Sequence, residues 1–210
     1  YVKNVPEAAD DVPEKLFTEA TKQWQEKYAE IKKMSGNENP YALHREMAEE
    51  MISNVLIVRE NSKLQATLNK IDEFEERWKN VNCVDTTDWS NPVPSFINQL
   101  RNMIQLSKII TKGALMRDEF RGSHYKPEFD LNQPSDFRPE SYLEYEKQKA
   151  AGKVNEEGFN PEHLTYMKRF AENNVKWLKS TIAIFKNGGA EITYEDVDES
   201  LIAPRPRKYD

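Results

Sequence analysis

The chain of 210 residues is long enough to bury a hydrophobic core, and its formal net charge of −6 comes with no cluster of basic residues. This charge pattern excludes the electrostatic footprint of a nucleic-acid-binding protein. The longest purely aliphatic run, Val55 to Val58, is far shorter than the roughly 20 residues that cross a bilayer, so we expect no direct membrane span. Cys83 is the only cysteine, which excludes an internal disulfide and a multi-cysteine metal site and fits a reducing compartment.

The first part of the chain predicts a connector followed by a helix. Residues 1–12 are acidic and contain Pro6, which is typical of a linker. The chain starts at Tyr1 without a signal segment, so we expect 1–12 to be a connector from an absent upstream domain. From Pro13 to Met34, apolar residues recur every three to four positions, which predicts an amphipathic helix with its stripe in the core. The stripe consists of Leu16, Ala20, Trp24, Tyr28 and Ile31.

The next segments predict further long helices. Asn39 and Pro40 are a good N-cap and first residue of a helix, and apolar stripes continue to Trp78 with a bend between residues 52 and 61. The polar stretch 81–94 predicts a loop, after which Ser95 is expected to cap a long helix that reaches Leu115. Residues 13–125 therefore predict a mainly α domain, a three-helix antiparallel bundle similar to a spectrin repeat.

Residues 126–210 predict a C-terminal extension. Helical patterns run from Pro139 to Ala151 and, after an N-cap at Asn160, from Pro161 to Lys179. Two short runs of β-forming residues flank Asn187-Gly188-Gly189, which predicts a small β-hairpin at about 181–196. The remaining residues from Pro204 to Asp210 are expected to be extended.

The residue types needed for catalysis are sparse. The three histidines, His44, His124 and His163, have no metal-ligand spacing, and His44 and His163 are typical of surface positions. No glycine-rich phosphate loop is present, and Cys83 has no basic neighbour that would favour its thiolate. The sequence therefore predicts no catalytic, cofactor-binding or metal-binding residue in this chain.

One segment, Arg117 to Tyr125, combines two arginines, an acidic pair, a glycine and a histidine. The structural interpretation is that Gly122 ends the preceding helix in a left-handed conformation, while the cations favour the negative end of the helix dipole. That interpretation accounts for Gly122 and Arg121 but not for the whole cluster.

At this segment the chain resembles the succinate dehydrogenase and fumarate reductase flavoprotein family. The C-terminal domain of that family carries Ala-Leu-x-Arg-x-Glu-Ser-Arg-Gly-Ala-His; here the residues are Ala114 to His124, with Phe120 and Ser123 in place of Ser and Ala. Weaker similarities follow in the same order along the chain. They lie at Met51, Val55, Arg59 and Leu64, at Tyr125 to Phe129, at Trp177 to Thr181, at Tyr194 to Val197 and at Pro204-Arg205.

The resemblance implies a parent enzyme of electron transport and the tricarboxylic acid cycle. Such an enzyme interconverts succinate and fumarate through FAD bound by an upstream domain, and passes electrons to an iron–sulfur subunit on a membrane anchor. It implies a peripheral position on the cytoplasmic side of the inner (plasma) membrane. The chain itself would be soluble, without catalytic activity, and would contact its own flavin domain. The candidate residues for that contact are Arg117, Glu119, Arg121, Gly122, His124 and Tyr125.

Two alternatives stay open. An L-aspartate oxidase has a similar helical domain and a similar Arg-Gly-x-His segment, although the hairpin and the stretch from Tyr194 to Arg205 favour the succinate enzymes. A free-standing helical adaptor that binds proteins is the alternative from another class. One departure from the family also stands out: residues 131–173 form an extra, partly helical insertion, which is either a partner contact or a tolerated surface excursion.

Overall fold

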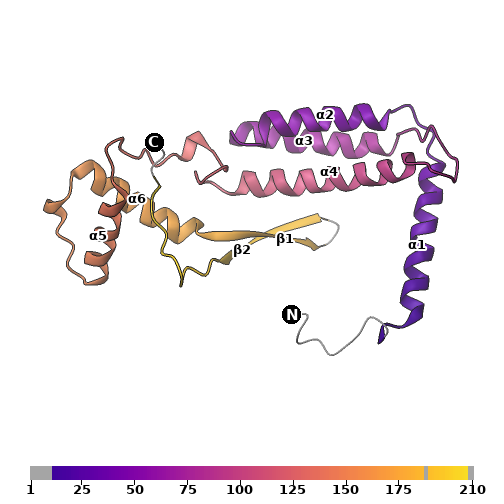
Figure 1. The fold of residues 1–210 in the computed structure, drawn as a ribbon. Coiled ribbons are helices and arrows are strands. Elements are labelled where there is room, and N and C mark those ends of the chain that lie inside the picture. Colours follow the sequence, from indigo (N-terminus) through magenta and orange to yellow (C-terminus); the bar gives the residue numbers. More distant parts are fainter. Residues whose placement is uncertain (1–10, 187–188, 208–210) are drawn as a thin grey trace. The chain divides into compact units, whose positions relative to one another are not determined.

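A computed structural model describes residues 11–186 and 189–207 (Figure 1). Nearly all of the predicted connector 1–12 lies outside these residues, and the division into connector, bundle domain and extension stays a prediction. The chain separates into two compact units, Tyr1–Glu49 with Lys70–Ser107 and Glu50–Asn69 with Lys108–Asp210. The described residues form six α-helices, two short 3₁₀ turns and one antiparallel hairpin, which confirms the mainly α fold class.

Helix boundaries follow the capping residues closely. Helices α1 and α2 are Glu14–Lys32 and Pro40–Asn54, and the Asn39 side chain accepts hydrogen bonds from the amides of Tyr41 at 2.9 Å and Ala42 at 3.3 Å, as predicted. Helix α3 is Asn61–Trp78, so the break expected between residues 52 and 61 is confirmed. Helix α4, Val93–Met116, begins before Ser95, because Pro94 fits the first turn, where no amide donor is needed. The predicted cap at Ser95 is therefore wrong.

The first unit packs segments of α2, α3 and α4 around an apolar core. The indole nitrogen of Trp78 on α3 donates to the carbonyl of Ile97 on α4 at 2.9 Å, and Arg77 binds Glu38 at 2.9 Å and Glu46 at 2.7 Å. These contacts tie the helices together at their surface. The buried apolar residues are Ile31, Leu43, Met47, Ile71, Phe74, Val81, Cys83, Val93, Ile97, Leu100 and Ile104.

Helix α1 differs from its prediction. Of the expected core stripe, only Ile31 is buried, while Leu16 is 55% exposed and Trp24 is 50% exposed. The amphipathic pattern is present, but the described part of the chain supplies no surface that covers it. The prediction that this stripe lies in the core is wrong for these residues.

The loop after α1 depends on Gly36, and Gly36→Ala is expected to lower the free energy of unfolding by about 2 kcal/mol or more. An added Cβ would lie 2.0 Å from the carbonyl oxygen of Asn80. The backbone cannot move away easily, because the Gly36 amide donates to the carbonyl of Val81 and the Glu38 amide donates to the carbonyl of Asn80. Urea denaturation of the chain measures the change.

Gly189→Ala is the matched control for Gly36→Ala, since an added Cβ at Gly189 meets no atom within 4 Å. It should change the free energy of unfolding by less than about 0.5 kcal/mol. Equal stability of the two variants would contradict the close approach at Gly36.

The second unit contains the other segments of α2, α3 and α4, where Val55, Leu64 and Ala114 form a small core with Met51 and Leu115. It also contains η3 (Pro127–Phe129), α5 (Pro139–Ala150), η4 (Glu156–Gly158) and α6 (Pro161–Trp177). The side chain of Asn160 caps α6 by accepting from the amide of Glu162 at 2.9 Å, as predicted.

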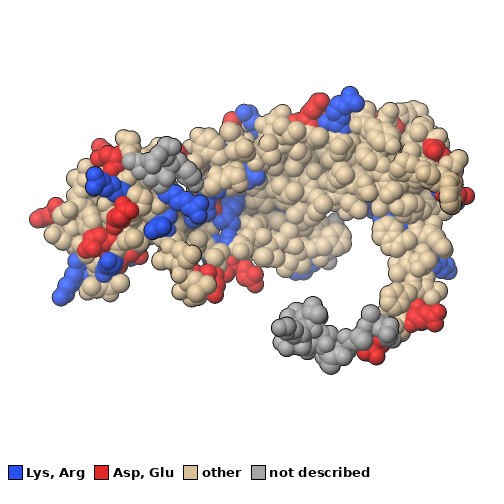
Figure 2. All heavy atoms as spheres, viewed as in Figure 1, with Lys and Arg blue, Asp and Glu red and all other residues tan. Residues whose placement is uncertain are grey.

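The predicted insertion 131–173 has its own core. Helices α5 and α6 lie beside each other (Figure 1), and Phe137, which precedes α5, packs with buried residues of both helices. The buried cluster consists of Phe137, Tyr142, Tyr145, Leu164, Tyr166 and Met167. Acidic and basic side chains are mixed over this part of the surface in Figure 2. Residues 131–173 therefore pack as a helical pair, as the partly helical pattern predicts, and their assignment as an insertion stays a prediction.

The hairpin is confirmed and is longer than predicted. Strand β1, Lys179–Lys186, pairs antiparallel with β2, Gly189–Asp196, with Lys179 opposite Asp196 and Lys186 opposite Gly189. The turn residues Asn187 and Gly188 lie outside the described residues. Lys112 of α4 donates to the carbonyl of Ala190 at 2.6 Å, which fixes β2 against α4.

Candidate functional site: a polar clasp at the end of helix α4

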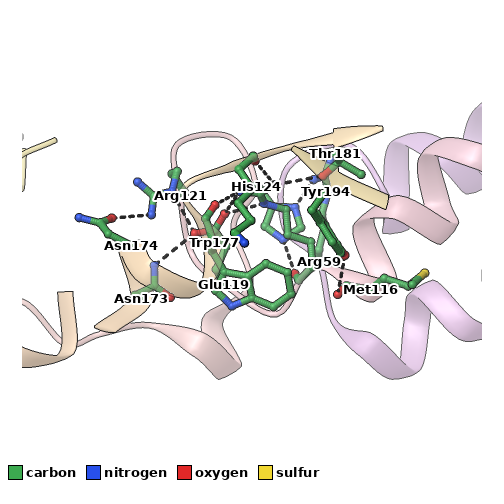
Figure 3. Close-up of polar contacts among 12 residues, drawn as sticks. Arg59, Met116, Glu119, Arg121, His124, Asn173, Asn174, Trp177, Thr181 and Tyr194 are labelled. Atoms are coloured by element: carbon green, nitrogen blue, oxygen red, sulfur yellow. Dashed lines mark hydrogen bonds and ion pairs between the residues drawn. The ribbon is translucent and has the colours of Figure 1, made fainter. Parts of the chain in front are cut away.

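Arg117 follows α4 directly and binds the segment where α6 passes into β1. Figure 3 shows Trp177 and Thr181 of that segment close to Glu119 and His124. Its guanidinium donates to the carbonyl of Lys179 at 2.7 Å, to the hydroxyl of Thr181 at 3.0 Å and to the carbonyl of Trp177. The carbonyl of Trp177 belongs to the last turn of α6, where a cation is favoured by the helix dipole. Arg117 thus joins three elements with one side chain.

Glu119 is the buried centre of the cluster, with no exposed side-chain surface. Its carboxylate accepts hydrogen bonds from the guanidinium groups of Arg117 at 2.5 Å and Arg121 at 2.9 Å. It also accepts from the side-chain amide of Asn173 at 3.2 Å. Arg121 also donates to the side chain of Asn174 at 2.9 Å. A buried carboxylate needs such partners, and here they come from both the Arg-Gly-x-His segment and α6. We call Arg59, Arg117, Glu119, Arg121, His124 and their partners on α6 and β1 the clasp.

Gly122 shapes a tight turn and does not end the helix. Helix α4 ends at Met116, and Arg121 and His124 then exchange backbone hydrogen bonds of 3.0 and 3.1 Å. Gly122 has a φ of 58°, so the left-handed conformation is confirmed, but its role as the helix terminator is wrong. The chain leaves the helix earlier because Arg117 and Glu119 are drawn into the clasp.

His124 connects this turn to the segment between α2 and α3. Its Nδ1 lies 2.5 Å from the guanidinium of Arg59, and its Nε2 lies 2.8 Å from the carbonyl of Arg117. Because arginine only donates, Nδ1 must accept and the proton must lie on Nε2. The Arg59 guanidinium also donates to the carbonyl of Val55 at 2.7 Å, and the backbone amide of Arg59 donates to the carbonyl of Tyr125 at 2.8 Å. The contact therefore requires neutral His124.

Lys126 adds a second buried charge beside the clasp. Its side chain is fully buried and donates to the carbonyl of Leu115 at 3.1 Å and to Asp118 at 3.0 Å, which also accepts from Asn61. Burial lowers the pKa of Lys126, while the hydrogen bond with Asp118 opposes that effect. This ion pair fixes the segment after the turn to the end of α4.

The protonation of His124 is expected to make the chain less stable at acidic pH. Burial holds the pKa of His124 below its ordinary value, and the positive charges of Arg59 and Lys126 lower the pKa further. The Arg117 carbonyl and Glu119 raise the pKa and offset only part of this effect. As the pH falls, the unfolded chain therefore binds a proton at this histidine before the folded chain does. The stability contributed by neutral His124 is fully present above the ordinary histidine pKa of about 6.5 and decreases below it. Urea denaturation between pH 8 and pH 5 measures this loss.

His124→Gln is the matched variant for the pH experiment, because its amide can donate to the Arg117 carbonyl but does not titrate. Its stability should depend less steeply on pH through this range than that of the unchanged chain. The same slope in both proteins would contradict the assignment to His124.

All six candidate residues of the sequence prediction belong to one segment, but the structure gives them different surroundings. Arg117 and Glu119 are engaged within the chain, whereas Gly122 is exposed and the Arg121 side chain is 34% exposed. Tyr125 packs edge-on against Phe120, with ring centroids 4.7 Å apart. Their assignment to a contact with another domain stays a prediction.

The sequence prediction missed several partners in the clasp. Arg59 and the stretch Trp177 to Thr181 were noted only as separate weak similarities, yet they meet Arg117 and His124 in space. The Tyr194 hydroxyl likewise donates to the carbonyl of Met116 at 3.2 Å. Asn173 and Asn174 carry no local pattern that could have identified them.

The described residues contain no group of three or more His, Cys, Asp or Glu side chains arranged to hold a metal ion. In the same ranges, each helix is too short or too polar to cross a membrane.

Comparison with known proteins places this architecture in a family. The family model described as fumarate reductase flavoprotein C-term matches residues 44–209. The chain therefore belongs to the C-terminal family of fumarate reductase and succinate dehydrogenase flavoproteins. This match confirms the resemblance that was drawn from the motifs.

The chain is similar to the succinate dehydrogenase flavoprotein subunit of Bacillus subtilis, with 38% identity over 100% of this chain and 29% of that protein. A fumarate reductase flavoprotein subunit of Helicobacter pylori is 32% identical over 45% of this chain and 13% of its own length. The fold is similar to that of an Escherichia coli quinol fumarate reductase, with a TM-score of 0.64 and 19% identity over 92% of this chain and 27% of that one. The chain thus spans less than a third of the length of these relatives.

Proposed function

We propose that the chain is the C-terminal helical part of a flavoprotein subunit that interconverts succinate and fumarate. FAD and the catalytic residues would lie in the preceding part of the polypeptide, and electrons would pass to an iron–sulfur subunit and through it to a membrane anchor. The complex would sit at the cytoplasmic face of the membrane. The family match and the names of the relatives support this proposal. The chemistry of such an enzyme belongs to the flavin, so this chain would supply structure.

A structural role for this chain is supported by one observation: the segments that resemble the family lie far apart in the sequence but meet at the clasp. Residues separated by up to 78 positions, such as Met116 and Tyr194, meet around Arg117 and Glu119. Inside the clasp, Arg117 and Glu119 are bound by hydrogen bonds within the chain. The exposed tip at Gly122 and Ser123, together with the open side of Arg121, is the part left to contact the flavin domain. In this proposal the clasp fixes the tip, and the tip contacts the neighbouring domain.

The first test is to express the complete gene product, record its visible absorption spectrum and assay dye reduction that depends on succinate. A flavin spectrum with succinate activity supports the proposal. Reduction that depends on L-aspartate instead would assign the parent to the related oxidases. A colourless protein would contradict a flavoenzyme and leave a helical adaptor.

Variants then separate the clasp from its exposed tip. Arg121→Ala and His124→Ala should lower both the activity and the thermal stability, because both side chains make internal contacts. Ser123→Trp should leave the isolated chain folded and lower the activity of the complete protein, since Ser123 is exposed here. Arg138→Ala, at an exposed site before α5, is the control. Full activity of Ser123→Trp would exclude the tip from the domain contact.

A further inference from the structure

Helix α1 presents an apolar stripe that the described residues do not cover. Phe17, Ala20, Thr21, Trp24, Gln25 and Tyr28 line an open groove of about 420 Å³ along one side of the helix. Phe17 is 57% exposed and Trp24 is 50% exposed. In Figure 2 the visible face of α1 is largely free of charged side chains. The groove and the stripe thus coincide.

An amphipathic helix such as α1 depends on packing for most of its stability. Helix α1 has 19 residues and begins after Pro13, whose side chain makes no capping hydrogen bond. Intrinsic helix propensity contributes little to the stability of a helix in a protein, and an amphipathic helix obtains most of its stability from packing of its apolar face. The stripe therefore requires a surface that packs against it.

The charges of α1 favour a protein surface over a membrane or a nucleic acid. Four lysines and four glutamates lie between Glu14 and Lys32, so the helix has no net charge. Lys15 pairs with Glu19 and Lys22 pairs with Glu26 across one turn. A helix that binds anionic lipids carries an excess of lysine and arginine, which is absent here.

The position of α1 in the chain identifies the occupant. The family model begins at residue 44 and describes a C-terminal region, so α1 lies on the side toward the preceding part of the polypeptide. The Bacillus subtilis relative covers this chain with only 29% of its length. A segment tethered next to α1 has an effective concentration in the millimolar range, which no free partner matches easily.

We propose that the stripe of Leu16, Phe17, Ala20, Trp24 and Tyr28 docks α1 onto the preceding, flavin-bearing part of the same polypeptide. This inference rests on the proposed function, because that function supplies the occupant. It adds a second point of attachment, on a helix outside the matched family region, to the tip at Gly122 and Ser123. Trp24, near the middle of the groove, is the main anchor.

Hydrogen exchange of the complete gene product tests the proposal. The backbone amides of residues 14–28 should be protected in that protein, and Trp24→Ala should raise their exchange rates by about tenfold or more. Alanine is the best helix former, so faster exchange would report lost docking and not lost helix propensity. Trp24→Phe should restore most of the protection. Lys22→Ala, on the charged face, should leave the exchange rates unchanged.

The outcomes distinguish the docking from the proposed function. A flavin spectrum and succinate activity together with unprotected α1 amides would overturn the docking and leave the function in place. Protection that rises with protein concentration would also overturn it, because a second copy would then cover the stripe. Protection independent of concentration in a protein without flavin would support docking onto the preceding segment while the flavoenzyme proposal fails.

Discussion

Glu119→Ala should lower the free energy of unfolding by about 3 kcal/mol or more, because it leaves buried cations without their partner. The carboxylate is fully buried, and Arg117, which it binds, has only 14% of its side chain exposed. Removing Glu119 also leaves the Asn173 amide without its acceptor. Equilibrium denaturation of the chain in urea measures the loss, and hydrogen exchange at α6 and β1 should show that these elements loosen first.

Two further variants define what Glu119 contributes. Glu119→Gln keeps an acceptor and the shape of the side chain, so it should be more stable than Glu119→Ala although it lacks the charge. Glu76→Ala removes a carboxylate that is 71% exposed and pairs with Lys79 only across one helical turn, so the change should be within about 0.5 kcal/mol. If Glu119→Ala were as mild as Glu76→Ala, the clasp would not be a stabilising centre.

Phe137→Ala should cost about 3 to 5 kcal/mol and disrupt the packing of α5 against α6. Phe137 is fully buried, and its ring lies 4.8 Å from that of Tyr166 and 5.4 Å from that of His163 in edge-on geometry. Its removal leaves a cavity in a core composed of a few aromatic residues. Near-ultraviolet circular dichroism should lose the signal of the tyrosines, and the amides of both helices should exchange faster.

Val175→Ala is the control for Phe137→Ala, since Val175 lies on α6 but is 80% exposed. It should leave the spectrum and the exchange rates close to those of the unchanged chain. A full near-ultraviolet signal in Phe137→Ala would show that the cluster does not hold α5 and α6 together.

Local signals predicted most of the secondary structure. Asn39 and Asn160 are caps whose side chains act within three residues, and the hairpin depends on a short turn between β-forming runs. Such patterns are complete in the sequence, because the groups that interact are neighbours. The fold class followed from them.

The failures arose where the outcome depends on distant residues. The stripe of α1 satisfies the pattern of a core helix, but burial requires a covering surface, and periodicity cannot say whether that surface lies within the same chain. Gly122 was expected to end a helix, but α4 ends at Met116 because Arg117 and Glu119 bind α6 and β1. A local pattern does not contain these contacts.

The candidate site was located but not explained by the sequence. The Arg-Gly-x-His segment identified Arg117, Arg121 and His124, yet their partners Arg59 and Asn174 lie 65 and 53 residues away. An asparagine on a helix has many ordinary roles, so Asn173 and Asn174 give no signal. Only the folded chain shows that the arginines are used mainly to hold the domain itself together.

The span of the clasp also orders events during synthesis on the ribosome. Met116 and Tyr194 are 78 residues apart, so at about 5 to 20 residues per second the hairpin emerges roughly 4 to 16 s after the end of α4. In this interval Arg117 lacks the acceptors at Trp177, Lys179 and Thr181. A nascent chain that stalls before the hairpin would expose an incomplete charged cluster. Folding of this part of the chain can therefore finish only after the last fifth of the sequence has been synthesised.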